Sequence, residues 1–178
     1  MGYPIVLLPT QLLLVNLITD GLPAIALGME PLDENEMKKS PRKSTESFFS
    51  GGLMSRIIFR GIMIGICTLG SFSTIYRMTC SVEHARTAAL LTLIASQLIH
   101  VFECKSETGN IFTVKYFNNP KLLLAVLTSV IIIVLSIYFP PLQNIFTTTA
   151  LSGKCLIISL AFSAVIPIIN CFFSFNNK

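Results

Sequence analysis

The chain has 178 residues, of which 52% are hydrophobic and 12% are charged, and its formal net charge is +4. Soluble domains carry about 25% charged residues. This chain therefore has too few charges to solvate a globule of its size, and we expect an integral, multi-pass membrane protein. Its basic residues lie in clusters between apolar runs. They do not form the basic, aromatic-rich stripe typical of nucleic-acid binding, so no nucleic-acid partner is expected.

Five apolar runs follow one another along the chain. They lie at about residues 8–29, 57–76, 85–102, 122–139 and 155–173. Each is long enough, or nearly so, for a helix that crosses a bilayer core ~30 Å thick. The sequence therefore predicts an all-α bundle of five transmembrane helices. The one sizeable polar insert, residues 30–55, is predicted to be a cytoplasmic loop.

The basic residues predict the orientation of this bundle, because they concentrate on the cytoplasmic side of membrane proteins. The loops and helix ends alternate between the two sides of the membrane. Those on one side hold ten of the 13 Lys and Arg residues, and those on the other side hold three. The richer set is Lys38, Lys39, Arg42, Lys43, Arg56, Arg60, Lys105, Lys115, Lys121 and Lys178, and the poorer set is Arg77, Arg86 and Lys154. We therefore expect the N-terminus outside and the C-terminus in the cytoplasm.

The first run contains one charged residue, Asp20. A carboxylate near the middle of a membrane span costs roughly 2.5–3.5 kcal/mol on insertion scales and is functional by default. Asn16 and Asp20 are four residues apart, which places them on one face of an α-helix with Thr19 beside them. Pro23 has no N–H and frees the carbonyl of Thr19. These are hard oxygen ligands of the kind that Ca²⁺, Na⁺ or Mg²⁺ prefers. The alternative is that Asp20 only pairs with a basic residue and fixes helix packing.

Two further clusters lie in the second and third runs. Gly61 and Gly65 form a G-x-x-x-G pattern, which allows close helix packing, although incidental glycines in a lipid-facing helix remain an alternative. His100, Glu103 and Cys104 have the i, i+3, i+4 spacing of a metal cluster. The interpretation that we favour is the cytoplasmic end of a helix. The polar content of this third run predicts a place inside the bundle.

The motif around Asp20 closely resembles the sixth transmembrane helix and the following loop of the P-type Ca²⁺-transporting ATPases. The resemblance rests on residues 16–24 (NLITDGLPA), 27–31 (LGMEP) and 39–42 (KSPR). It is closest to the sarco/endoplasmic-reticulum branch and its bacterial relatives. It is ungapped over the first 60 residues, and the later runs match in order, spacing and topology. The five runs then correspond to helices six to ten of the family's ten.

The resemblance implies that Asn16 and Asp20 ligate the transported cation, Ca²⁺, with Thr19 as a supporting ligand. Two-ion members of the family have a glutamate in helix eight, and the ungapped placement puts Gln97 there. Because Gln97 carries no charge, we expect one Ca²⁺ per cycle. A polar hydrogen bond between helices is an equally weighted alternative for Gln97.

The family phosphorylates an aspartate in an Asp-Lys-Thr-Gly-Thr motif, which this sequence does not contain. We therefore expect that the chain does not hydrolyse ATP alone. ATP and Mg²⁺ would act through domains outside it. The expected partners are membrane lipid and the N-terminal part of a pump, with helices one to five and the cytoplasmic domains. The sequence leaves open whether the chain is a fragment, a split subunit or the product of a truncated gene. Two other functions also remain: a non-catalytic relic or regulatory partner of a pump, and a small secondary cation carrier.

Overall fold

The computed structural model describes residues 4–29, 53–105 and 118–175, and the secondary structure assigned within them is helical. The first run forms α1 (Pro9–Asn16), the π-helix η1 (Leu17–Gly21) and α2 (Leu22–Gly28). The long helices that follow are α3 (Leu53–Thr79), α4 (Val82–Lys105), α5 (Pro120–Tyr138) and α7 (Gly153–Phe175), and the short helix α6 (Pro140–Phe146) precedes α7. The prediction of an all-α bundle is confirmed.

Within the described residues, four segments are long and apolar enough to cross a membrane, and a fifth, shorter apolar helix covers Gly153–Ile169. The four are Pro9–Gly28, Met54–Thr79, Val82–Cys104 and Pro120–Tyr138. All five overlap the predicted runs. The bounds differ at α3, which begins at Leu53 and so includes the last residues of the predicted loop. The rest of that loop lies outside the described residues.

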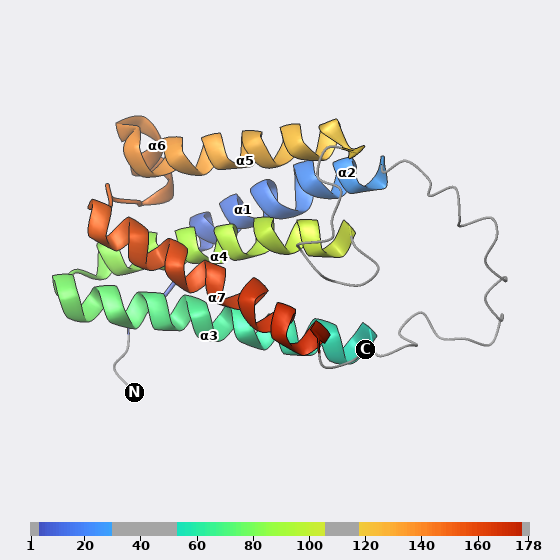
Figure 1. Cartoon of the computed structure of the whole chain (residues 1–178). Helices are drawn as coiled ribbons and strands as arrows, with labels where there is room; N and C mark the ends of the chain where they lie inside the picture. The colour runs from blue at the N-terminus through green and yellow to red at the C-terminus, as the bar shows by residue number, and fades with distance from the viewer. Residues whose placement is uncertain (1–3, 30–52, 106–117, 176–178) are drawn as a thin grey trace, which may run out of the picture.

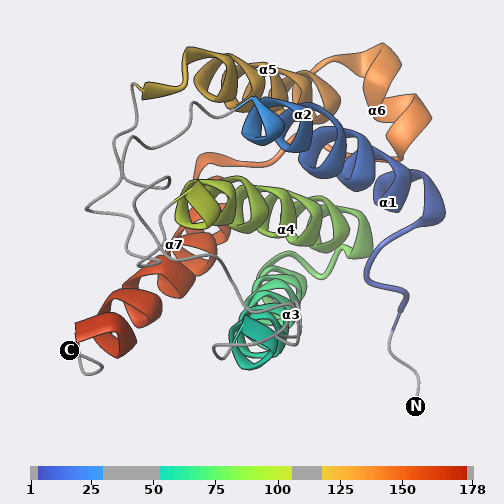
Figure 2. The same cartoon turned by 90° about the vertical axis from the view of Figure 1, so that its right-hand side faces the viewer.

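The long helices lie side by side, with α4 in the middle of the bundle (Figure 1). Helices α3 and α7 pack against α4 and against each other, whereas α5 packs mainly on α2 and touches η1 and α4 less extensively. The view along the bundle shows α4 between the first span on one side and α3 with α7 on the other (Figure 2). The predicted interior position of the third run is confirmed, because Ala85, Ala88, Leu90 and Ile94 of α4 are fully buried.

Hydroxyl groups connect the three helices α3, α4 and α7 inside this core. Thr92 Oγ1 of α4 lies 2.8 Å from Ser71 Oγ of α3 and 3.3 Å from the carbonyl oxygen of Ser159 in α7. All three residues are fully buried. Such hydrogen bonds contribute to helix association in membranes, where the hydrophobic effect between helices is absent.

One glycine of α3 is required for close packing. A Cβ atom at Gly70 would lie 2.8 Å from Cε1 of Phe162 on α7. A Cβ atom at Gly61 or Gly65 would instead have no atom of the described residues within 4 Å. The close packing that the G-x-x-x-G pattern allows therefore does not occur between the described helices.

The connection from α5 to α7 is held by polar contacts at the end of the bundle where α1 begins. The buried Gln11 of α1 donates from Nε2 to the carbonyl of Thr147, at 3.2 Å. The backbone N–H of Thr149 donates to Thr87 Oγ1 of α4, at 3.0 Å. Thr148 donates to the carbonyl of Ser136. The short helix α6 in this connection was not predicted, because its seven residues give no usable hydropathy signal.

Candidate cation site

The first span changes from an α-helix to a π-helix at the turn that contains its one charged residue, Asp20. It is α-helical to Asn16, π-helical over Leu17–Gly21 and α-helical again to Gly28. Single-turn π segments are rare and occur often at functional sites. A physical cause is present in Pro23, which cannot donate a backbone hydrogen bond to the preceding turn. The local break predicted from Pro23 is therefore found, with a π turn as its form.

The π register changes which carbonyl lacks a donor. In an α-helix the carbonyl of residue i accepts from residue i+4, so Pro23 would leave the carbonyl of Thr19 free. In a π-helix the donor is residue i+5. The nitrogen of Pro23 then falls opposite the carbonyl of Ile18. The sequence expectation, which assumed α-helical geometry, named the neighbouring carbonyl.

The sequence-predicted residues of the first span lie within and beside this turn. Asn16 ends α1 and its side chain is exposed in the described structure. Thr19 is buried, at 7% exposure, and its hydroxyl donates to the carbonyl of Val15 at 2.9 Å. The lone pairs of a donating hydroxyl oxygen can still coordinate a cation. Asp20 lies on the π turn itself. The expected common face of Asn16 and Asp20 assumed α-helical geometry, which the turn interrupts.

Gln97 lies on the central helix α4, which packs against η1. It shares a helical face with Ile94 and Val101, which are three residues before it and four after it. Ile94 belongs to the same buried cluster as Ile18, and Val101 packs against a second cluster that includes Ala26 of α2. The Oε1 atom of Gln97 is buried and has no hydrogen-bond partner among the residues that the structure describes. A buried acceptor without a donor costs ~1–3 kcal/mol.

Helix α5 supplies two polar groups that sequence reasoning missed. Ser129 Oγ lies 3.1 Å from the carbonyl oxygen of Ile18, at the π turn. Asn119 Nδ2 donates to the carbonyl of Ala26 at 2.9 Å, and Asn119 Oδ1 caps α5 by accepting from Leu122 N–H at 3.0 Å. Both side chains are almost completely buried. A small polar residue in an apolar run was the available signal, but it does not identify a partner 111 residues away.

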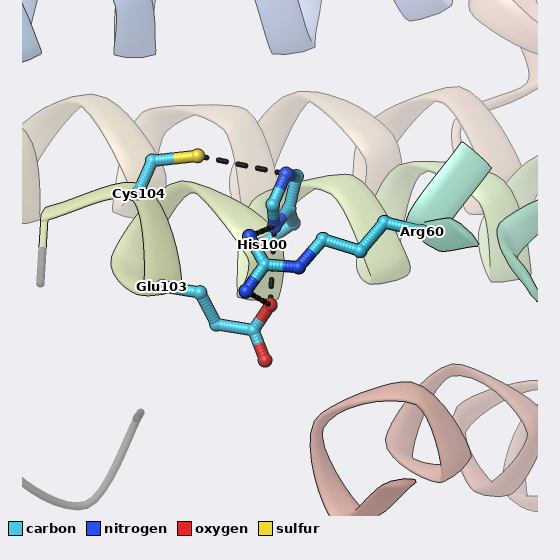
Figure 3. Close-up of polar contacts among 4 residues, drawn as sticks. All are labelled: Arg60, His100, Glu103 and Cys104. Atoms are coloured by element: carbon cyan, nitrogen blue, oxygen red, sulfur yellow. Dashed lines mark hydrogen bonds and ion pairs between the residues drawn. The ribbon is translucent and has the colours of Figure 1, made fainter. Parts of the chain in front are cut away.

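The cluster at the end of α4 joins two helices (Figure 3). Arg60 of α3 reaches Glu103, with 3.6 Å between its nitrogen and Oε2, and His100 Nδ1 lies 3.1 Å from the same oxygen. Cys104 Sγ is 3.5 Å from His100 Nε2. In the described part of the chain, no group of three His, Cys, Asp or Glu side chains is placed to hold a metal ion. The three residues of α4 lie at its C-terminal end, as the interpretation of a helix end expects.

The chemistry of the candidate site is that of oxygen ligands. The four predicted residues offer an amide, a hydroxyl, a carboxylate and a second amide. Even with both carboxylate oxygens of Asp20, they provide fewer than the roughly six to eight oxygens that Ca²⁺ takes. Further ligands would have to come from water or from other helices.

Comparison with known protein families shows to which family the chain belongs. The model of the family described as "Cation transporting ATPase, C-terminus" matches residues 4–175. The chain belongs to this family. The match covers all five apolar runs and includes both the first span, which holds the π turn, and the central helix α4. As a member of the cation-transporting ATPase C-terminal family, the chain is a membrane protein, and its apolar helices fit the transmembrane part of such an ATPase.

Several calcium-transporting ATPases are similar in sequence to this chain. The Calcium-transporting ATPase of Bacillus subtilis (strain 168) is 41% identical over 166 residues, which cover 93% of this chain and 18% of that protein. Calcium-transporting ATPase 1 of Bacillus cereus is 38% identical over 168 residues, covering 85% and 19%. Calcium-transporting ATPase type 2C member 1 of Mus musculus is 31% identical over 170 residues, covering 96% and 18%. The chain spans about a fifth of the length of these curated relatives.

Proposed function

We propose that this chain is the C-terminal part of the transport domain of an ATP-driven Ca²⁺ pump and that it contributes Asn16, Thr19, Asp20 and Gln97 to the Ca²⁺ site. The observation that carries the proposal is the π turn Leu17–Gly21, which interrupts a membrane span at its one carboxylate. Interrupted helices near the middle of the membrane are a recurring way to coordinate transported ions. The relatives named above are calcium-transporting ATPases, which supports Ca²⁺ as the cargo.

The division of roles follows from chemistry and position. Asp20 supplies the negative charge that a divalent cation requires. Thr19 offers a hydroxyl oxygen whose proton is directed to Val15. Gln97 offers a buried amide oxygen that has no donor in the described residues. A cation beside that oxygen would satisfy it, which supports Gln97 as a ligand over a simple hydrogen bond between helices.

The exposed side of the first span supports a larger assembly. Asn16 is exposed there together with the apolar Leu13 and Leu17, which are 69% and 61% exposed. An amide facing lipid at this depth is unfavourable because it finds no hydrogen-bond partner. We propose that the N-terminal part of the pump covers this side and supplies the remaining ligands. ATP and Mg²⁺ would act on domains of that part.

The test uses a complete pump that carries this chain as its last five spans. One form replaces the matched region of the Bacillus subtilis calcium-transporting ATPase, to which the chain is 41% identical, with these 178 residues. Phosphorylation from ATP is measured against Ca²⁺ concentration for the unmodified chain, for Asp20→Asn and for Asp33→Asn. Asp33 lies beyond the apolar run and serves as the control for charge loss.

We expect Ca²⁺-dependent phosphorylation with the unmodified chain and with Asp33→Asn, and its loss with Asp20→Asn. Unchanged Ca²⁺ dependence in Asp20→Asn would contradict the proposal. A pump that reaches the membrane but is not phosphorylated with the unmodified chain would also count against it. Ca²⁺ flux through the chain alone in liposomes, without ATP, would favour a secondary carrier instead.

A further inference from the structure

We propose that Ser129 of α5 is a positioning residue of the cation site, which fixes the peptide that carries Thr19. This inference rests on the proposed Ca²⁺ site at the π turn. Ser129 is not itself proposed as a ligand. It acts through the backbone, because its hydroxyl lies 3.1 Å from the carbonyl oxygen of Ile18.

The carbonyl of Ile18 needs a donor from outside its own helix. Within the π register its partner would be the nitrogen of Pro23, which has no hydrogen. The side chain of Ile18 is fully buried, and so is Ser129. A buried carbonyl without a donor is unfavourable, particularly in a membrane interior where water does not supply one. The hydroxyl of Ser129 provides this donor across the interface between α5 and η1.

The hydroxyl is held in place by its own helix. Ser129 Oγ lies 2.9 Å from the carbonyl of Ala125 as well as 3.1 Å from that of Ile18. Its single hydrogen is therefore shared between one acceptor on α5 and one on the π turn. This arrangement fixes the side-chain rotamer and directs the hydroxyl to the turn.

The carbonyl of Ile18 belongs to the peptide that joins Ile18 to Thr19. Its orientation therefore sets the position of the Thr19 backbone and, one peptide further, that of Asp20. Cation ligands need to be held within about half an ångström of their working geometry by supporting hydrogen bonds. Loss of the Ser129 hydroxyl would leave the turn formed but less restrained. We expect weaker Ca²⁺ binding with an intact pump.

Helix α5 offers two matched controls for this experiment. Ser136 is as deeply buried as Ser129, but its hydroxyl donates to Ile132 of its own helix, at 2.8 Å. Thr128 is half-buried, and its exposed hydroxyl donates to the carbonyl of Leu124 of its own helix, also at 2.8 Å. Among the described residues, neither hydroxyl makes a hydrogen bond to the first span. Ser136→Ala controls for loss of a buried hydroxyl, and Thr128→Val for a change beside Ser129.

The experiment measures ATP-driven Ca²⁺ uptake into vesicles by the complete pump that carries this chain. The two quantities are the Ca²⁺ concentration for half-maximal rate and the maximal rate. We expect Ser129→Ala to raise the half-maximal Ca²⁺ concentration ~3- to 10-fold with the maximal rate nearly unchanged. Ser129→Thr, which keeps the hydroxyl, should restore the wild-type value. Ser136→Ala and Thr128→Val should stay at that value.

The positioning role would be overturned if Ser129→Ala left the half-maximal concentration unchanged, or if Ser136→Ala raised it equally. A fall in maximal rate alone would also overturn it, since that indicates a structural defect. If Ser129→Ala does not accumulate in membranes, Ser129→Cys replaces it, because a thiol is a weaker donor of similar size; the same rise is expected. Asp20→Asn, measured in parallel, separates the two proposals. A wild-type half-maximal Ca²⁺ concentration in Asp20→Asn would contradict the proposed Ca²⁺ site. The same result in Ser129→Ala alone would contradict only the positioning role of Ser129.

Discussion

Arg60 of α3 and Glu103 of α4 form an ion pair whose carboxylate is buried, with 3.6 Å between the guanidinium nitrogen and the carboxylate oxygen. The side chain of Glu103 is 1% exposed and that of Arg60 is 17% exposed. His100 contributes a second nitrogen to the same oxygen, at 3.1 Å. The pair joins the beginning of α3 to the end of α4 (Figure 3). It therefore compensates a carboxylate that would be costly to bury alone.

Removal of this guanidinium should destabilise the chain. We expect Arg60→Met to lower the free energy of unfolding by ~1–3 kcal/mol, because the buried carboxylate of Glu103 loses a charged partner. Thermal unfolding of the chain in detergent micelles, followed by circular dichroism, measures the loss. Arg60→Met with Glu103→Gln should be more stable than Arg60→Met alone, since a neutral amide then replaces the buried carboxylate that lost its guanidinium partner. A double variant no more stable than the single one would contradict this account.

Thr92 should contribute to the association of α3, α4 and α7. We expect Thr92→Val to lower the free energy of unfolding by ~0.5–2 kcal/mol, because the Thr92 hydroxyl makes hydrogen bonds to two neighbouring helices. The matched control is Thr128→Val, since that hydroxyl is exposed and contacts its own helix. The same micelle experiment applies. Equal losses for both variants would show that the contacts between helices add nothing measurable.

Pro23 should be required for the form of the first span. We expect Pro23→Ala to supply a backbone N–H and to let an α-helix continue through Leu17–Gly21, which would move Thr19 and Asp20 relative to Gln97. In the complete pump the half-maximal Ca²⁺ concentration should rise ~10-fold or more, since misplaced ligands bind weakly. Pro120→Ala is the control, because Pro120 lies in the first turn of α5, where an N–H has no helical acceptor. A wild-type Ca²⁺ response in Pro23→Ala would contradict the role of the turn.

Gln97 offers a test between its two interpretations. If its amide oxygen is a ligand, Gln97→Leu should raise the half-maximal Ca²⁺ concentration ~10-fold or more and leave thermal stability nearly unchanged or higher. If it makes only a hydrogen bond between helices, Gln97→Leu should lower stability without changing the Ca²⁺ response. The two measurements on one variant therefore separate a ligand from a packing contact.

The positions of the helices could be predicted because long apolar runs and clustered charges are local features of the sequence. All five predicted runs are helical, and the polar third run forms the central helix. The disturbance at Pro23 was also predicted, since proline lacks a donor wherever it occurs. Its π form was not predicted, because hydropathy and spacing arguments assume α-helical geometry throughout a span.

The support for the site could not be predicted, because it depends on contacts between distant segments. Ser129 and Asn119 are ordinary polar residues by sequence, and only the packing of α5 on the first span brings them to the carbonyls of Ile18 and Ala26. The buried oxygen of Gln97 is a tertiary feature of the same kind. The candidate ligands were identified from residue type and family resemblance.

Direct Ca²⁺ binding is the measurement that tests the central proposal most closely. Equilibrium binding of radioactive ⁴⁵Ca²⁺ to the complete pump that carries this chain, without ATP, isolates the site from later steps of the cycle. We predict saturable binding with the unmodified chain and with Asp33→Asn, and no saturable binding with Asp20→Asn over the same concentrations. Equal binding by the unmodified and Asp20→Asn pumps would contradict the assignment of Asp20 as a Ca²⁺ ligand.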